Sequence, residues 1–168
     1  HTFSQFGSAT LAGAATFLSS HMVVNPLTML VESDVLAGLP HPISIGDPLS
    51  RVHVDGTALV TTRFHVAANR VRELVKGARD THGSCGMGVH ETMRDHQLGH
   101  PSIAVAGLLT PAFLRARLEQ IQEQKFAALN VAYSQAPQSQ ALEDEFSLLR
   151  DPAVVDVLVE RMTRWAQR

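Results

Sequence analysis

The sequence predicts an α/β fold, and two observations support this. Short apolar stretches of strand length recur in the first two thirds of the chain, between segments with apolar residues at helical spacing. After residue 109 only the helical spacing continues, and no segment repeats. We therefore expect a single domain over residues 1–168. Residues 1–109 would form part of a mainly parallel sheet with flanking helices, and residues 110–168 a C-terminal helical appendage.

The composition is that of a globular protein. With 168 residues, 45% hydrophobic and 18% charged, the chain can bury roughly two thirds of its unfolded surface. A net charge of −2 gives no electrostatic reason to expect nucleic acid or an anionic membrane as a partner. No apolar run approaches the roughly 20 residues of a membrane span, and no signal peptide opens the sequence. The single cysteine fits a reducing, cytoplasmic location.

The first elements are short. Residues 2–6 alternate polar and apolar side chains, which predicts a strand, and Thr16–Leu18 and residues 22–24 are expected as short buried strands. Asn25 and Pro26 then predict a helix start, because Asn caps and Pro needs no hydrogen-bond donor at the first helical position. The helix should end at Gly38, and its predicted apolar face comprises Leu27, Leu30, Val31 and Val35.

The middle of the chain contains two predicted strands, at residues 51–54 and 58–61, followed by a helix that ends at Gly77. The apolar stripe of this helix comprises Phe64, Ala67, Ala68, Val71, Leu74 and Val75. Its other faces would carry His65, Asn69, Arg72 and Glu73. A short helix is expected over residues 89–98, and residues 103–109 are an apolar run of strand length.

The last third predicts three helices. Thr110 and Pro111 open the first, which continues to about Tyr133 with Phe113, Leu114, Leu118 and Ile121 at helical spacing. After a polar break at residues 135–140, a second helix is expected over residues 142–149. Asp151 and Pro152 open the third, whose stripe comprises Val154, Leu158, Met162 and Trp165.

The clearest candidate for a binding site is the stretch at residues 81–89, which reads Thr-His-Gly-Ser-Cys-Gly-Met-Gly-Val. Glycines at this density predict a loop whose backbone N–H groups can approach an anion, most often a phosphate. The helix that follows would direct its N-terminus at the same anion. The candidate phosphate-binding residues are Gly83, Ser84, Cys85 and Gly86. The alternative is a glycine-rich turn that binds nothing.

Two neighbouring segments resemble the adenylosuccinate synthetase family. The His-Val-Ala and Arg-Glu of residues 64–73, followed by Gly-Ser-Cys-Gly-Met-Gly-Val, are similar to its His-Val-Ala…Arg-Glu helix and Gly-Thr-Thr-Gly-Arg-Gly-Ile loop. Ser-Ala-Thr-Leu at residues 8–11 is similar to the family's Ser-Gly-Ile-Leu, and residues 23–26 to its Gly-Val-Val…Pro segment. Residues 113–133 lie where the family has a long amphipathic helix. The resemblance covers a middle section of that enzyme.

The resemblance implies a homodimeric enzyme of purine biosynthesis that ligates IMP and aspartate with GTP and Mg²⁺, through 6-phosphoryl-IMP. Gly83, Ser84, Cys85 and Gly86 would hold the IMP 5′-phosphate, with Cys85 in place of a phosphate-contacting Thr. The family's GTP phosphate loop and its catalytic Asp and His would lie upstream, and its guanine- and aspartate-binding segments downstream. We therefore expect no catalytic residue and no GTP or Mg²⁺ ligand in this chain, and no activity from it alone. Since the sequence begins with His1 instead of Met, we expect a fragment or a product of processing or cloning.

This sequence departs from the family at three points. A thiol at Cys85 is a weaker donor than a hydroxyl, and Met87 replaces the loop arginine. Around Gly99 and His100, where the family places an arginine that reaches across the dimer, there is no arginine. These changes predict weaker phosphate affinity. They also leave a second hypothesis, a non-catalytic nucleotide-binding or dimerisation module.

Three other groupings have a functional and a structural interpretation. His82, His90, His96 and His100 could bind a metal or form a polar surface, and Arg94 stands where a zinc-protease helix needs its second histidine. Cys85 beside His82 could be a nucleophile, or a small residue tolerated in a tight turn. The acidic run at residues 143–145 predicts a solvated helix face.

Overall fold

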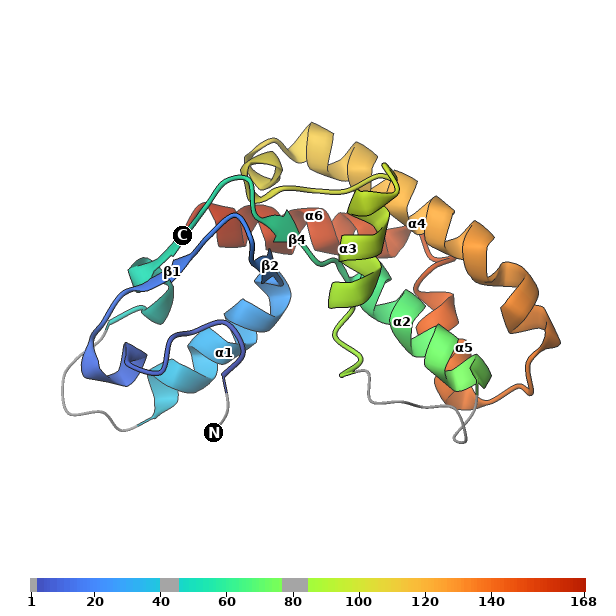
Figure 1. The fold of residues 1–168 in the computed structure, drawn as a ribbon, viewed down its shortest axis with the longest axis horizontal. Coiled ribbons are helices and arrows are strands. Elements are labelled where there is room, and N and C mark those ends of the chain that lie inside the picture. Colours follow the sequence, from blue (N-terminus) through green and yellow to red (C-terminus); the bar gives the residue numbers. More distant parts are fainter. Residues whose placement is uncertain (1–2, 40–45, 77–84) are drawn as a thin grey trace.

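The computed structural model describes residues 3–39, 46–76 and 85–168, and it has a mixed α/β fold (Figure 1). The strands are short: β1 (Thr16–Leu18), β2 (Val23–Val24), β3 (Val52–Val54) and β4 (Leu59–Val60). The α-helices are α1 (Pro26–Gly38), α2 (Arg63–Lys76), α3 (Val89–Gln97), α4 (Pro111–Gln135), α5 (Gln140–Ser147) and α6 (Ala153–Ala166). Within the described ranges, no helix has the length and apolar character that spanning a membrane requires.

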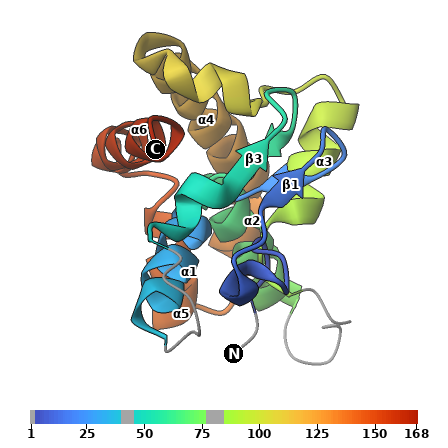
Figure 2. The same cartoon turned by 90° about the vertical axis from the view of Figure 1, so that its left-hand side faces the viewer.

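Both strand pairs are parallel, as the sequence predicts. β1 pairs with β3, with Phe17 opposite His53, and β2 pairs with β4, with Val23 opposite Leu59. Figure 2 shows β1 and β3 side by side, on the same side of the molecule as α1. The two pairs form separate ladders, and each strand contains only two or three residues.

Helices α4 and α5 pack on α2, and α6 packs on α4, so that the helices of the last third complete one hydrophobic core. Phe64, Ala67, Ala68 and Val71 of α2 have no exposed surface, and α2 packs against both α4 and α5. Fully burying a large apolar side chain contributes roughly 1.5–3 kcal/mol. Figure 1 shows the long helix α4 extending past α3, α2 and α5. The buried residues of α4, α5 and α6 include Leu114, Leu118, Ile121, Leu142, Phe146, Leu158 and Met162.

Two predicted strands are wrong. Of residues 2–6, Thr2 lies outside the described residues and the others form no strand. The Glu32 carboxylate accepts hydrogen bonds from the N–H groups of Ser4 and Gln5, at 2.9 and 3.2 Å, so neither group is available to a strand partner. In the apolar run at 103–109, Val105–Leu109 forms a 3-10 helix instead.

Helix α1 starts as predicted, but only part of its predicted apolar face turns inward: Leu27 and Leu30 are partly buried against the core, whereas Val31 and Val35 are exposed. The Asn25 side chain accepts a hydrogen bond from Thr28 N–H at 3.2 Å, Pro26 follows, and Gly38 is the last helical residue. The buried residues are Pro26, Met29, Glu32, Ser33 and Leu36, whereas Val31 is 63% exposed. The hydrogen bonds from the N-terminal segment to Glu32 hold this polar face inward and leave Val31 and Val35 outside.

Candidate functional site

The glycine turn immediately before α3 is built on left-handed backbone. Gly86 and Gly88 have φ angles of +63° and +77°, a region that side-chain-bearing residues rarely adopt. A Cβ on Gly88 would lie 2.7 Å from Val66 N, so only glycine allows the turn to approach α2 this closely. The Asn69 side-chain oxygen also accepts a hydrogen bond from Gly88 N–H at 3.4 Å.

The structure describes part of the predicted phosphate-binding set. Cys85 is exposed and Gly86 lies beside the Arg70 side chain of α2, whereas Gly83 and Ser84 lie outside the described residues. The expected helix after the turn is present as α3, with Gly88 as its N-cap residue. The described part of the turn is thus placed at a helix N-terminus, where N–H groups without helical partners favour an anion.

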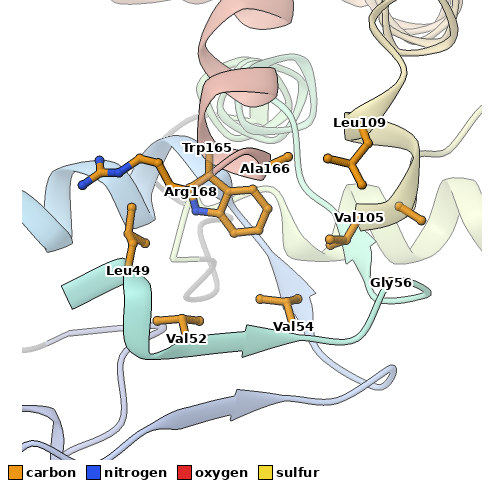
Figure 3. Close-up of a pocket in the computed structure, with 10 residues that line it drawn as sticks. Leu49, Val52, Val54, Gly56, Val105, Leu109, Trp165, Ala166 and Arg168 are labelled. Carbon is orange, nitrogen blue, oxygen red and sulfur yellow. The ribbon is translucent and has the colours of Figure 1, made fainter. Parts of the chain in front are cut away.

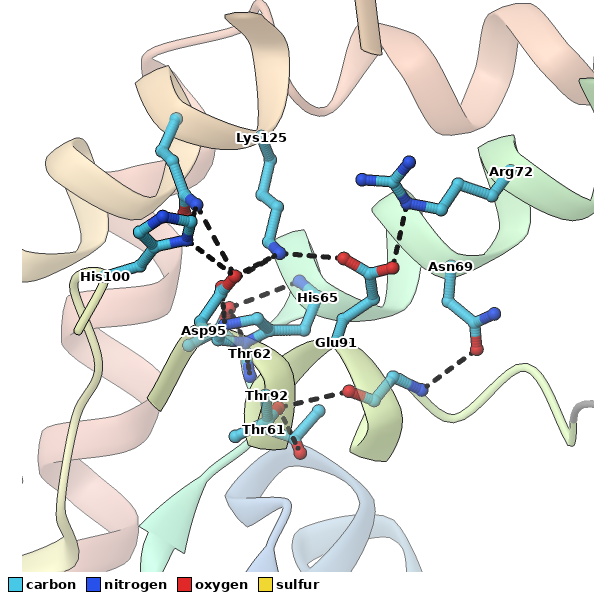
Figure 4. A network of polar contacts seen from close by, with 12 residues as sticks. Thr61, Thr62, His65, Asn69, Arg72, Glu91, Thr92, Asp95, His100 and Lys125 are labelled. Atoms are coloured by element: carbon cyan, nitrogen blue, oxygen red, sulfur yellow. Dashed lines mark hydrogen bonds and ion pairs between the residues drawn. The ribbon is translucent and has the colours of Figure 1, made fainter. Parts of the chain in front are cut away.

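Helix α3 is fixed by a buried pair of carboxylates. Glu91 and Asp95 lie one helical turn apart and are each 2% exposed. Lys125 of α4, also 2% exposed, donates from Nζ to both carboxylates at 2.8 Å (Figure 4). Arg72 of α2 donates from Nε to Glu91 at 2.9 Å. These contacts, which we call the α3 clamp, join α2, α3 and α4.

His65, which the sequence places on a face of α2 other than the apolar stripe, is buried and belongs to the same clamp. Its side chain has no exposed surface, and its Nδ1 accepts a hydrogen bond from Thr62 N–H at 3.0 Å. Because a backbone N–H can only donate, Nδ1 carries no proton and the ring proton is on Nε2. Nε2 lies 3.2 Å from the Asp95 carboxylate. Burial lowers the pKa of His65, and this outweighs the opposing interaction with Asp95.

The two carboxylates of the clamp are ionised. Burial by itself would raise the pKa of Asp95, but the hydrogen bonds from His65 and Lys125 and the Lys125 charge lower it well below its usual range. Burial opposes the charged form of Glu91 too, and the bonds and charges of Lys125 and Arg72 outweigh it, so that its pKa is also lowered. With two anions, two cations and a neutral imidazole, the clamp suits a structural role better than proton transfer at neutral pH.

A second ionic cluster lies between α2 and α5. Glu145 accepts from Arg63 Nη2 at 3.1 Å and from Arg70 Nη1 at 2.6 Å, and its side chain is 13% exposed. The prediction of a solvated acidic face over residues 143–145 is therefore wrong for Glu145, because these two arginines cover its carboxylate. Glu143 is also paired, with Arg150 and with the Tyr133 hydroxyl.

The histidine cluster does not assemble into a metal site in the part of the chain that the structure describes. No three His, Cys, Asp or Glu side chains within those ranges come together in a way that could hold a metal ion. His100 instead contacts Gln124 and Asp95, with Nδ1 at 2.6 Å from Gln124 Nε2. His82, and with it the proposed pairing with Cys85, lies outside the described residues.

An apolar cavity lies away from the glycine turn. It has a volume of about 300 Å³ and opens between β3, the 3-10 helix at Val105–Leu109 and the end of α6 (Figure 3). Val52, Val54, Val105 and Trp165 contribute to its walls. Such a lining does not suit a phosphate, so the glycine turn remains the candidate site.

The family model of adenylosuccinate synthetase matches residues 1–163. The chain is also 32% identical, over 129 residues, to the adenylosuccinate synthetase of Haloarcula marismortui. The protein therefore belongs to the adenylosuccinate synthetase family, and the resemblance seen in the sequence is confirmed. The alignment covers 75% of this chain but 26% of that relative, so the chain spans about a quarter of the relative's length.

Proposed function

We propose that this chain is the part of an adenylosuccinate synthetase that holds the 5′-phosphate of IMP. The whole enzyme would ligate IMP and aspartate with GTP, through 6-phosphoryl-IMP, as a cytoplasmic homodimer. The observation that carries the proposal is the left-handed turn at Gly86 and Gly88, directly before α3 and pressed against α2. A glycine turn at a helix N-terminus is a common phosphate-binding arrangement.

In this proposal the backbone does most of the binding. N–H groups of Gly83 to Gly86 donate to the phosphate oxygens, and the N-terminus of α3 adds a favourable electrostatic field. Ser84 Oγ donates as well, and Cys85 Sγ adds a weaker hydrogen bond. The clamp keeps α3, and with it the turn, at a fixed angle to α2.

GTP and Mg²⁺ enter the proposal through the family. In such a ligase Mg²⁺ neutralises phosphate charge, but the close carboxylates described here do not fit it, because Lys125 Nζ already lies between Glu91 and Asp95. We assign no step of the reaction to a metal held by these residues. The chain by itself is expected to hydrolyse no GTP and to form no adenylosuccinate. Phosphate release that a substitution within this chain abolishes would contradict that expectation.

The experiment is a calorimetric titration of IMP, with inosine as the ligand that lacks the phosphate. Wild type should bind IMP more tightly than inosine. Gly86→Val should weaken IMP binding, because a β-branched residue does not adopt the left-handed turn. Cys85→Ser should keep or increase affinity, by no more than the roughly 1.5–3 kcal/mol of a charge-assisted hydrogen bond. Equal affinities for all three proteins, or equal binding of IMP and inosine, would refute a phosphate site at the turn.

A further inference from the structure

A phosphate at the glycine turn needs a cation, and the described residues of the turn itself carry none. Cys85, Gly86, Met87 and Gly88 have no cationic side chain. A site that relies on N–H groups alone leaves much of the phosphate charge uncompensated, and proteins commonly complete such sites with arginine. The compensating charge must therefore come from a residue packed against the turn.

Arg70 is the cation that lies against the turn. A Cβ built on Gly86 would lie 3.7 Å from Arg70 Nε and 3.9 Å from Arg70 Cγ, so the side chain passes directly beside this glycine. The Arg70 side chain is 43% exposed and can be reached by a ligand from solvent. Glu145 takes a hydrogen bond from Nη1. A guanidinium has five N–H donors, so donors on its Nε side can face an anion at the turn.

The charge balance of the cluster also favours an added anion. Arg63 and Arg70 lie two turns apart on one face of α2, and both pair with the single carboxylate of Glu145. Two cations and one anion leave one positive charge. Glu73, also on α2, accepts a hydrogen bond from Asn69 Nδ2 at 3.3 Å, and the Asn69 side-chain oxygen accepts one from Gly88 N–H. The α3 clamp, in contrast, is balanced and buried.

We infer that Arg70 is a phosphate-binding residue that supplies the cation for an anion held at the Gly86–Gly88 turn, with Glu145 keeping its guanidinium in place. The inference rests on the proposed function in that IMP is the anion expected there. It assigns the phosphate contact to a residue of α2, outside the glycine stretch itself. Glu145 both positions Arg70 and competes with the ligand for its donors.

The test is a titration of IMP, inosine and inorganic phosphate into the folded chain and four variants. Arg70→Gln should weaken binding of IMP and of inorganic phosphate about tenfold or more, and leave inosine unchanged, since a hydrogen bond to a charged group is worth at least a factor of that size. Arg63→Gln is the matched control, because it removes an arginine from the same helix and the same carboxylate. It should weaken binding less than about threefold. Arg70→Lys should fall between wild type and Arg70→Gln.

Glu145→Gln gives a result of opposite sign. The amide oxygen of glutamine still accepts a hydrogen bond from the Arg70 guanidinium, but the competing negative charge is gone. Affinity for inorganic phosphate should therefore rise or stay level while the thermal midpoint falls. A purely structural role for the Arg63, Arg70 and Glu145 cluster predicts equal losses of binding in Arg70→Gln, Arg63→Gln and Glu145→Gln, and that pattern would overturn the inference.

The two proposals fail in different ways. If wild type binds IMP and Arg70→Gln binds it equally well, Arg70 does not contact the phosphate, although the proposed function survives. If inorganic phosphate binds through Arg70 but IMP binds no better than inosine, the anion site stands and the nucleotide function fails. If wild type binds neither IMP nor inorganic phosphate, both proposals are refuted.

Discussion

The α3 clamp predicts a large loss of stability when Lys125 is replaced by Met. Methionine keeps the length and apolar stem of lysine but leaves Glu91 and Asp95 buried without the ammonium that lies 2.8 Å from each. Removing one partner of a buried ion pair typically costs about 3–5 kcal/mol. Arg72 still pairs with Glu91 and His65 still faces Asp95, so we expect the lower end, about 3 kcal/mol.

Urea denaturation at pH 7 measures this directly. For an m-value of about 1–3 kcal/mol per molar, a loss of about 3 kcal/mol lowers the midpoint by about 1–3 M urea. Lys76→Met is the control, because Lys76 is exposed at the end of α2 and its loss should change stability by less than about 0.5 kcal/mol.

A triple variant separates the charge from the packing. In Lys125→Met with Glu91→Gln and Asp95→Asn, no buried carboxylate is left without a cation, and Arg72, whose side chain is 32% exposed, is solvated, so most of the lost stability should return. A cost below about 1 kcal/mol for Lys125→Met alone would show that the clamp is not energetically important. A triple variant as unstable as the single one would show that packing, and not charge, explains the loss.

Three further predictions concern residues around the turn and α2. Gly86→Ala should lower the free energy of unfolding by about 1–2 kcal/mol, the cost of a side chain on left-handed backbone. Gly88→Ala should lower it more, because of these two glycines only Gly88 would place its Cβ 2.7 Å from backbone atoms. Equal thermal midpoints for the two variants would contradict this. Val71→Asp should cost several kcal/mol in chemical denaturation, since it places a carboxylate at a position with no exposed surface. Burial lowers the pKa of His65 below 6.5, so its stability contribution is complete above that pH and declines as the pH falls. His65→Gln should therefore flatten the loss of stability as the pH falls below about 6.5, and an unchanged slope would assign that loss to other groups.

Local signals in the sequence predict the helices well. Asn25 and Pro26 mark the start of α1, and Pro111 the start of α4, because capping and proline geometry depend on residues close in sequence. The apolar stripe of α2 is buried at Phe64, Ala67, Ala68 and Val71, whereas Leu74 is 41% exposed. Beyond Val71, burial depends on which other elements cover the end of the helix, and the spacing of apolar residues in the sequence does not reveal this.

The errors occur where distant residues supply the hydrogen bonds. The apolar run at 103–109 matches a strand in composition, but a strand needs a partner along its length. Here Val60 N–H donates to Ile103 O and Val105 N–H to Ala58 O, and the chain then turns into a 3-10 helix. Phe113 packs against Gly107 of this turn, where a Cβ would lie 2.7 Å from its ring. Neither these hydrogen bonds nor the contact between Phe113 and Gly107 can be read from the local sequence pattern.

The candidate site was predictable only in part. Closely spaced glycines reveal the turn, since glycine is unfavourable inside helices and strands, but the clamp depends on charges that come together from three helices. One signal was present: Lys125 continues the buried stripe of Leu118 and Ile121 on α4, a position where an unpaired lysine would be costly. The i, i+4 pair of Glu91 and Asp95 on the next helix upstream was a natural partner, and the two observations together predict the clamp.

The two ionic clusters differ in burial and in charge balance, and this difference favours different roles. Buried charges must be compensated within the fold, because desolvation penalises any excess, and the α3 clamp is balanced in this way. Around Glu145 the arginines are 33% and 43% exposed, so solvent tolerates one excess positive charge there. Within the described ranges both arginines pair with Glu145, and Gly86 lies next to Arg70, where an added anion would balance the excess charge. The clamp on one side of α3 is neutral overall, and the cluster beside the turn that precedes α3 is exposed and net positive. Together they suit the binding of a phosphate, and no group in either cluster has to change protonation for it.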